Sequence, residues 1–531
     1  MKNKALQFFI GVAFFCCIVP LVYGAGIKKI NTGIKADSLT TVQLLNWNIS
    51  KDSTVKYYKN IIPLKKAVIL SSINRSTIPS VMGEMNYDTY DGANCKVIGS
   101  TYPGDRSIFL GWNYLNYYIS GTNFNDNQKD HIVSVPTPGE INIGHKNGVK
   151  VLGCVDFLWG SGSKNLNTFC ENPSLVKEKL LKLAKAFKFD GYFFNIEVDG
   201  SSKDVNAILD IMSYLKAKGL HVSWYDAMKD NGKLDYTNSL NKRSIKLFKN
   251  SSSFFANYWW LKTPIKHFDI SVKTANSVKG RSAADVYLAV QWWSNEKRFD
   301  AIKSIYYYNA GNSLKNRLSV ALYAAEFPVR GNLTDTASYT TSEFVKMWFA
   351  NNVYPTANQT PQRMGDYVIP KTTITSLPFK TEFNVGKGNK YFKNGSIVSA
   401  KGWGKLSEQN ILPYYMLDNK SIAENFDFTT AWNGGSSLKI TNKSDKNQIV
   451  PVYLTAINTK SYKNIFVKVV YKSKNPGSLI LNTNSSPIKI DLSSKVKSLN
   501  DGYYEVSGKI NSNSKITGIN SRCREIENLE C

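Results

Sequence analysis

Apolar runs with the length of strands alternate with polar, lysine-rich runs of helical period between about residues 107 and 350. The apolar runs predict strands at 115–120, 149–158, 191–198, 221–228, 253–260, 285–293 and 318–324. The polar runs predict helices at 174–187, 204–218 and 296–308. The first helix follows Asn172 and Pro173, which suit a cap and a first turn, and the second ends at Gly219.

This alternation predicts an α/β fold, a (β/α)8 TIM barrel in which the eighth unit is weakly marked. A doubly wound open sheet is the competing fold. The barrel is favoured because a barrel builds its site from many strand ends, whereas an open sheet concentrates the site near one switch point. Polar or aromatic residues stand at the ends of five predicted strands, at 156–159, 195–199, 225–226, 257–260 and 291–293.

The pattern changes after about residue 371, where short alternating runs are broken by Gly, Asn and Ser. Such runs predict an antiparallel β-sandwich. They lie at 436–441, 449–457, 464–472, 477–483 and 503–510. The expected domains are a signal segment at 1–24, a barrel with an N-terminal entry segment at 25–370, and the sandwich region at 371–531. The sequence leaves open whether the sandwich binds carbohydrate or braces the barrel.

The first 24 residues have the features of an export signal. Lys2 and Lys4 precede an apolar run at 6–22, and Gly24 offers a small residue for cleavage. An uncleaved anchor is the alternative, because the run approaches the ~18 residues that span a bilayer. We therefore expect a chain that is periplasmic, secreted or at the cell surface, with no stable membrane span after cleavage.

The spacing of the cysteines, the number of histidines and the distribution of charge indicate which ligands and partners to expect. In an oxidising compartment Cys154 with Cys170, or Cys523 with Cys531, could form disulfides. No cysteine pair has metal-site spacing and the chain has only 4 His, so we expect no metal and no other cofactor. The net charge is +27, but the Lys residues are scattered rather than clustered with aromatics, so nucleic acid is not an expected partner.

The stretch FDGYFFNIEVDG, residues 189–200, places one amide and one acid two residues apart at the end of an apolar run. In a strand, Asn195 and Glu197 project to the same face, which in a barrel is the interior near its mouth. A carboxyl group among aromatic side chains keeps its proton more readily, which suits a general acid. In the simplest alternative, the two side chains only bond to neighbouring strands.

The amide of Asn195 indicates a particular mechanism of glycoside hydrolysis. Most glycosidases use two carboxylates, whereas here an amide stands in place of the second. An amide can orient another amide, and 2-acetamido sugars carry one beside the reacting carbon. The pattern predicts substrate-assisted hydrolysis, in which the acetamido oxygen attacks and an oxazoline forms. Asn195 would stabilise the nitrogen side, while Glu197 would protonate the leaving oxygen and then activate water.

Four motifs in order resemble those of glycoside hydrolase family 85, the endo-β-N-acetylglucosaminidases. Residues 190–197, DGYFFNIE, resemble its strand-end motif and are related to the chitinase pattern D-G-x-D-x-D-x-E, with Phe193 and Asn195 where chitinases carry Asp. VSWYDAM, FFANYWW and SVALYAAEF resemble its W-Y-D-S-M, N-[FY]-x-W and A-L-Y-A-P-x-W segments. Downstream, FNVGKGNKYFKNG and TAWNGGSSL look like the β-rich region of the family.

The resemblance implies retaining, substrate-assisted hydrolysis of the GlcNAc-β1,4-GlcNAc bond in the chitobiose core of N-linked glycans. It implies that Glu197 is the acid/base, that Asn195 positions the acetamido group, and that the hydroxyl of Tyr225 helps to hold it. Substrate contacts are expected at Trp159, Tyr236, Asn257, Tyr258, Trp259, Trp260 and Trp292. Core packing is the plain alternative for each aromatic residue.

The sequence also departs from the family. Gln291 stands where members often show a charged residue, and residues 325–327 lack the usual Pro and Trp. The preference for high-mannose, hybrid or complex glycans is therefore open. Two other classes also stay open: a chitinase-like hexosaminidase and a noncatalytic glycan-binding adhesin.

Overall fold

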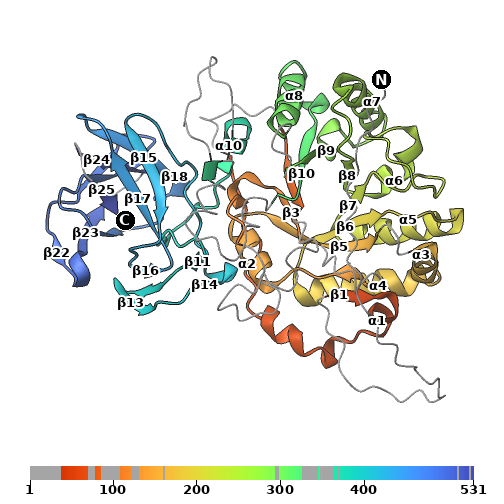
Figure 1. The fold of residues 1–531 in the computed structure, drawn as a ribbon, viewed down its shortest axis with the longest axis horizontal. Helices are drawn as coiled ribbons and strands as arrows, with labels where there is room; N and C mark the ends of the chain where they lie inside the picture. Colours follow the sequence, from red (N-terminus) through yellow and green to blue (C-terminus); the bar gives the residue numbers. More distant parts are fainter. Residues whose placement is uncertain are drawn as a thin grey trace, which may run out of the picture.

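A computed structural model shows a barrel on one side and a group of antiparallel sheets on the other (Figure 1). The structure describes residues 38–69, 78–84, 108–121, 131–158, 162–292, 298–325, 345–346, 348–349, 363–368, 370–510, 514–524 and 528–530. The predicted signal segment, Trp159 and Cys531 lie outside these residues.

Eight parallel strands form the barrel. In order around the ring they are β2 (Val81–Glu84), β3 (Tyr117–Ile119), β5 (Lys150–Phe157), β6 (Gly191–Ile196), β7 (His221–Tyr225), β8 (Ser253–Ala256), β9 (Val286–Gln291) and β10 (Ser319–Tyr323). The ring is closed because β10 pairs with β2 and β5 pairs with β6. The predicted TIM barrel is confirmed, the open sheet is excluded, and all seven predicted strands are present. Only β2 was not predicted.

Two short strands extend the sheet outside the ring. Strands β1 (Ser38–Thr40) and β4 (His131–Ser134) pair antiparallel with each other, and β4 pairs antiparallel with β5. Short helix α1 (Thr41–Asn46) follows β1 directly. The entry segment thus joins the barrel at the edge of β5.

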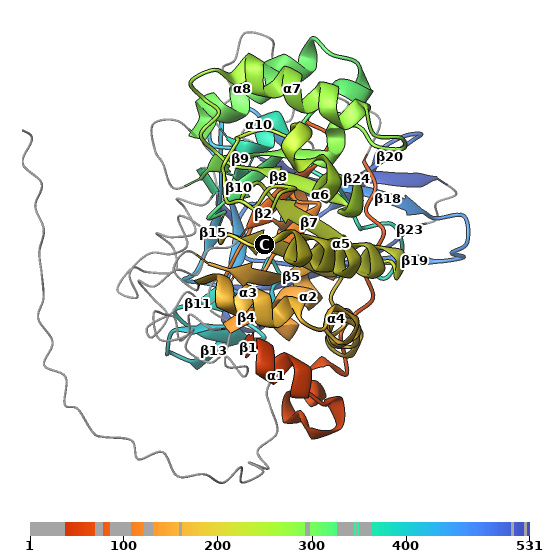
Figure 2. The ribbon, with the colours of Figure 1, turned by 90° about the vertical axis from the view of Figure 1, so that its right-hand side faces the viewer.

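Helices surround the strands (Figures 1 and 2). They are α2 (Pro138–Lys146), α3 (Gly162–Cys170), α4 (Pro173–Phe187), α5 (Ser202–Ala217), α6 (Ile245–Asn250), α7 (Pro264–Asn276), α8 (Arg298–Ala310) and α10 (Met364–Tyr367). Helix α4 begins where Asn172 accepts a hydrogen bond from the N–H of Leu175, as its sequence predicts. It buries an apolar stripe that includes Leu180, Leu183 and Phe187.

Alternation along each strand separates two cores. In β6, Tyr192 and Phe194 face the helices, whereas Phe193 belongs to the inner cluster with Tyr225 and Phe255. Because side chains alternate with a period of two, the inward side of Phe193 is also the side of Asn195. Strand parity therefore directs the polar end of β6 into the barrel.

Gly191 lets β6 and β7 approach closely at the start of β6. Its φ is 154°, and a Cβ there would lie 1.9 Å from the carbonyl oxygen of His221. No side chain fits at this point, so the first residue of the strand must be glycine. The close approach fixes the register that carries Asn195 and Tyr225 to neighbouring strand ends.

The C-terminal region consists of antiparallel sheets, as predicted. The larger ones are β15–β17–β25, β18–β24–β20–β21 and β19–β23–β22. Their strands are β15 (Ile422–Asp427), β17 (Ser437–Asn442), β18 (Gln448–Asn458), β19 (Ile465–Tyr471), β20 (Ser478–Thr483), β21 (Ile488–Asp491), β22 (Lys497–Ser498), β23 (Tyr504–Ile510), β24 (Lys515–Cys523) and β25 (Asn528–Glu530). Smaller pairings join β11 (Lys387–Gly388), β12 (Tyr391–Lys393), β13 (Ser396–Ser399), β14 (Trp403–Gly404) and β16 (Asn433–Gly434).

Buried hydrogen bonds connect this region to the barrel. The Gln409 amide donates to the carbonyl of Phe109 at 2.9 Å, and the Tyr114 hydroxyl donates to the carbonyl of Tyr414 at 2.7 Å. The Lys146 ammonium, at the end of α2, donates to the carbonyl of Gln409 at 2.6 Å. These contacts brace the barrel along α2 and the segment before β3.

Cys154 and Cys170 do not form the disulfide that the sequence allowed. Both are buried thiols, and they donate to different carbonyls, those of Ser120 and Asp204. Cys523 is also a buried thiol. Burial raises the pKa of Cys170 well above its usual value and the pKa of Cys523 to about 11, so both keep their protons.

Membrane and metal features can be stated for the described residues. Within them, every helix is too short or too polar to cross a bilayer. The same residues contain no group of three or more His, Cys, Asp or Glu side chains placed to hold a metal ion.

Candidate active site

The end of β6 holds an amide and an acid in contact. The Asn195 Nδ2 donates to Glu197 Oε2 at 3.2 Å, which places the two side chains on one inward face as strand parity predicted. Asn195 is buried, and its Oδ1 accepts no hydrogen bond from the part of the chain that the structure describes. A buried amide oxygen without a donor is uncommon and indicates a place for a ligand donor.

Glu197 sits in surroundings that favour its protonated form. Burial raises the pKa of Glu197, while hydrogen bonds from Tyr236 and Asn195 act in the opposite direction. The Tyr236 hydroxyl donates to Glu197 Oε1 at 2.7 Å. Burial and the neighbouring Glu197 raise the pKa of Tyr236, so this hydroxyl stays a donor. The site can therefore lend and recover one proton at Glu197.

Tyr225, at the end of β7, lies next to this pair in the inner cluster. Its hydroxyl donates to Asn257 Oδ1 at 2.8 Å, and its ring lies 6.1 Å from that of Tyr236. Asn257 was expected to contact substrate, but it is 1% exposed and its Nδ2 donates to Asn238 Oδ1 at 2.8 Å. With both ends of its amide engaged, Asn257 lies behind Tyr225, which corrects that expectation.

Aromatic rings gather beside Glu197. Trp259 is 60% exposed, and its ring meets the edges of Tyr236 and Tyr258 at centroid distances of 6.0 and 5.6 Å. Tyr258 also stacks on Tyr323 at 5.8 Å, with the ring planes 20° apart. These rings offer apolar faces of the kind on which sugar rings pack. Tyr323 was not predicted, although it lies within the quoted SVALYAAEF segment.

Two predicted aromatic contacts are core residues instead. Trp260 is 0% exposed, and its Nε1 donates to the carbonyl of Ala289 at 2.9 Å. Trp292 is equally buried and packs against Phe299 and Trp348 at 5.6 and 5.3 Å. Both rings point into the layer between strands and helices, so neither can line the opening. Trp159 lies outside the described residues.

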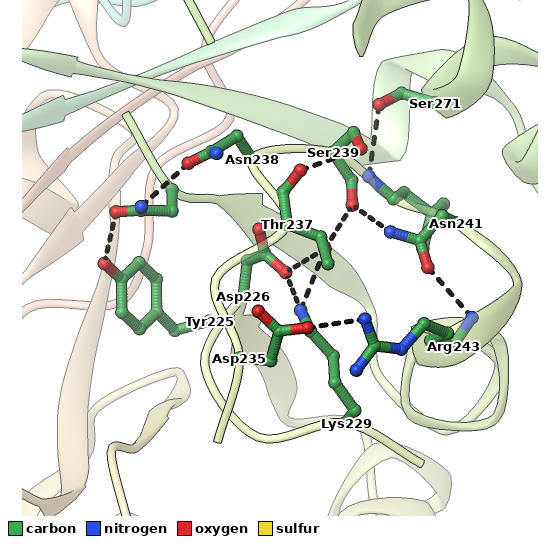
Figure 3. Close-up of polar contacts among 12 residues, drawn as sticks. Tyr225, Asp226, Lys229, Asp235, Thr237, Asn238, Ser239, Asn241, Arg243 and Ser271 are labelled. Carbon is green, nitrogen blue, oxygen red and sulfur yellow. Dashed lines mark hydrogen bonds and ion pairs between the residues drawn. The ribbon is translucent and has the colours of Figure 1, made fainter. Parts of the chain in front are cut away.

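The segment after β7 reaches the site through Tyr236 and is anchored by polar contacts (Figure 3). Asp226 and Lys229 form an ion pair with no exposed surface, and Thr237 bonds to both. Near the end of β6, Asp199 accepts from the N–H of Leu234 at 2.8 Å. This network was not predicted, and within the sequence its signal is the Asp of the WYD motif.

A glycine contact completes the anchoring. The N–H of Gly200 donates to the carbonyl of Gly232 at 2.8 Å, and a Cβ on Gly232 would lie 2.3 Å from the carbonyl oxygen of Gly200. The φ of Gly232 is 81°, a left-handed value that glycine adopts without strain. The segment after β7 is thereby fastened to the chain that leaves β6.

A family profile and two curated relatives match much of this chain. The profile described as Glycosyl hydrolase family 85 matches residues 100–391. The cytosolic endo-beta-N-acetylglucosaminidase of Gallus gallus is 27% identical over 345 residues, covering 63% of this chain and 43% of that protein. The Homo sapiens protein of the same name is 27% identical over 368 residues, covering 65% of this chain and 46% of that protein. The chain thus spans less than half the length of these relatives.

One solved structure shares the architecture. The glycoside hydrolase domain of Endo-D from Streptococcus pneumoniae superposes with a TM-score of 0.72 at 20% identity, covering 92% of this chain and 81% of that domain. At this identity the likeness establishes the shared fold.

The curated relatives also correct one expectation. The matched proteins of chicken, human, mouse and zebrafish are all named as cytosolic. This finding contradicts the export predicted from residues 1–24, a stretch that lies outside the described residues.

Proposed function

The chain belongs to glycosyl hydrolase family 85, and from this membership we propose that it is an endo-β-N-acetylglucosaminidase acting on N-linked glycans. The bond proposed for cleavage is the GlcNAc-β1,4-GlcNAc linkage of the chitobiose core. One GlcNAc would stay on the asparagine of the glycoprotein.

One observation carries the proposal: the buried Oδ1 of Asn195 has no donor among the described residues, while its Nδ2 is held by Glu197. The acetamido N–H of a 2-acetamido sugar is a donor of the right kind for that oxygen. With its nitrogen held, the acetamido group would direct its carbonyl oxygen at the adjacent anomeric carbon.

The first step follows from these contacts. The acetamido oxygen bonds to the anomeric carbon while the bond from that carbon to the leaving oxygen breaks. Glu197, whose protonated form is favoured by burial, gives its proton to the leaving oxygen. The product on the donor side is an oxazolinium, whose N–H faces Asn195 Oδ1.

The second step returns the proton. Glu197 is now a carboxylate and takes a proton from water, whose oxygen attacks the anomeric carbon from the face that the leaving group vacated. The bond to the acetamido oxygen breaks, and the sugar is released with retained configuration. Tyr225 lies beside the pair and would bound the acetamido pocket, while Trp259 and Tyr258 would support the sugar ring.

Two other functions rank below this one. A chitinase-like site would carry acids at positions 193 and 195, but Phe193 packs in the inner core and Asn195 is an amide. A noncatalytic adhesin would gain nothing from a carboxyl whose pKa is raised by burial beside an amide oxygen that has no donor among the described residues. Both outcomes are separable by experiment.

The test incubates the protein with a high-mannose glycoprotein, such as a glycosylated ribonuclease, and with chitin oligomers, and weighs the products by mass spectrometry. A protein product that keeps a single GlcNAc supports the proposal. Chitin fragments alone would indicate the chitinase-like enzyme, and no cleavage of either substrate would indicate the adhesin.

Asn195 variants test the assisted mechanism. Asn195→Ala should lower turnover of the glycoprotein far more than turnover of a preformed oxazoline donor, because only the first reaction needs the acetamido group to attack. Equal loss on both substrates would contradict the role given to Asn195. Asn206→Ala is the matched control, since Asn206 is an exposed amide on α5.

A further inference from the structure

A single segment, residues 229–241, reaches both halves of the candidate site. Tyr236 donates to Glu197, the acid, while Asn238 accepts from Asn257, which in turn accepts from Tyr225. The acid and the tyrosine come from different strands, β6 and β7. Besides the pairing of β6 with β7, this segment contacts both groups, so its conformation affects both.

The contacts of Asn238 form a directed chain of hydrogen bonds. Asn238 Oδ1 accepts from Asn257 Nδ2 at 2.8 Å and from the backbone N–H of Trp259 at 3.3 Å. Because the backbone N–H can only donate, it fixes the acceptor end of Asn238 toward Asn257. Asn257 must then present its nitrogen to Asn238 and its oxygen to Tyr225. The Tyr225 hydroxyl therefore directs its one proton at Asn257.

Asn238 is held in an unusual backbone conformation. Its φ is 57°, in the left-handed region that Asn, Asp and Gly tolerate better than other residues. The preceding residue, Thr237, is fixed by hydrogen bonds of 3.0 Å with both Lys229 and Asp226 (Figure 3). A buried ion pair therefore anchors the residue next to Asn238, and the left-handed turn aims its side chain at Asn257.

We propose that Asn238 is a positioning residue that acts through Asn257 to fix the place and the hydrogen-bond direction of the Tyr225 hydroxyl. Asp226, Lys229 and Thr237 hold Asn238 in the conformation that this requires. The consequence for turnover rests on the proposed glycosidase function, whereas the consequence for geometry does not.

Two substitutions separate the side-chain acceptor from the backbone turn. Asn238→Gly keeps the left-handed backbone and removes the acceptor, while Asn238→Asp keeps both. We expect Asn238→Gly to lower kcat about tenfold, equivalent to one hydrogen bond, with KM changed less than about twofold. Asn238→Asp should recover most of that loss. Equal losses in the two variants would overturn the proposal.

A double variant tests whether Asn238 acts through Tyr225. In a Tyr225→Phe background there is no hydroxyl to direct, so adding Asn238→Gly should lower kcat less than about twofold further. Losses that multiply in the double variant would overturn the proposal. Thermal unfolding of each variant shows whether a lower rate reflects a smaller folded fraction.

Crystal structures of the two single variants give a readout that needs no turnover. In Asn238→Gly the Asn257 amide should rotate or become disordered, and the Tyr225–Asn257 hydrogen bond should be lost; in Asn238→Asp it should persist. An unchanged Asn257 in Asn238→Gly would overturn the proposal. If the wild-type protein cleaves no glycan, the proposed function fails, and this comparison still decides the role of Asn238.

Discussion

The two ends of the barrel use polar side chains in different ways. At the amino ends of the strands, Asp190 accepts from the N–H of Val151 at 2.8 Å and pairs with His145 at 2.9 Å, while His145 also bonds to the carbonyl of Ile62. At the carboxyl ends, Asn195 keeps one buried oxygen without a donor from the described chain. His145 and Asp190 at the base are bonded within the described chain, whereas Asn195 at the mouth keeps bonding capacity for a ligand.

The two ends also differ in what protonation does. Burial tends to lower the pKa of His145, but Asp190 and the carbonyl of Ile62 raise it overall, so a protonated His145 strengthens the base. Burial raises the pKa of Glu197, which keeps a proton available at the mouth. Protonation of His145 at the base favours the fold, whereas protonation of Glu197 at the mouth serves the proposed reaction.

The largest expected effect is at the mouth. Glu197→Gln should lower turnover by about a thousandfold or more, because it removes the group that donates and recovers the proton. The midpoint of thermal unfolding should stay within a few degrees of wild type. Glu178→Gln is the control, since Glu178 is an exposed acid on α4. Turnover above a tenth of wild type would contradict the role of Glu197.

The buried Asp226–Lys229 ion pair lies at the mouth beside β7, but we expect it to stabilise the fold, as the polar contacts at the base do. Lys229→Met should lower the free energy of unfolding by about 3–5 kcal/mol, because it leaves Asp226 charged and buried without its partner. Urea unfolding measures this. Adding Asp226→Leu should restore much of the loss, since it removes the unpaired charge. No recovery in the double variant would assign the loss to packing.

Asp190→Asn tests the base directly. At low pH it should lower the free energy of unfolding by about 1.5–3 kcal/mol, the range for a hydrogen bond to a charged group. The pKa of His145 is raised in the fold, so this stabilisation is complete below about 6.5, the usual value, and is lost as pH rises through the folded value. Unfolding curves at pH 5.5 and 8.5 should differ accordingly, and a loss that ignores pH would contradict the charged pair.

The smallest expected effect is a change in the pKa of Glu197 at the mouth of the barrel. Tyr236→Phe removes a hydrogen bond that favours the Glu197 carboxylate, so the pKa of Glu197 should rise further. Because the protonated acid is the active form in the proposed mechanism, the alkaline limb of the kcat/KM profile should move to higher pH. Tyr307→Phe, at an exposed ring on α8, is the control. A limb that moves to lower pH would contradict the assignment.

Sequence periodicity predicted the features that depend on local geometry. The alternation of β6 placed Asn195 and Glu197 on one face, and Asn172 marked the start of α4. Strand β2 was not predicted because it has only four residues, VMGE, and includes a glycine. A short stretch of sequence shows a clear period for β6 and α4 but too few residues to reveal β2.

Features that depend on folding at a distance were not predictable. Trp259 and Trp260 are adjacent and chemically alike, yet one is exposed and the other fully buried, because the chain turns between them. Asn238 lies 19 residues from its partner Asn257 and shows no motif. Lys229 resembles the many surface lysines of a basic chain, and only the three-dimensional structure shows that it is buried.

The contacts that hold residues 229–241 indicate which positions of this segment can be varied without moving the candidate site. The contact between Gly200 and Gly232 fixes residues 229–241 relative to the end of β6. An insertion or deletion between Gly232 and Tyr236 would therefore displace both Tyr236 and Asn238. Asn231 and Lys233 flank Gly232 and are both exposed, but Lys233 also pairs with Asp199 at 3.2 Å. A library confined to position 231 would vary the rim while Tyr236 and Asn238 keep their register.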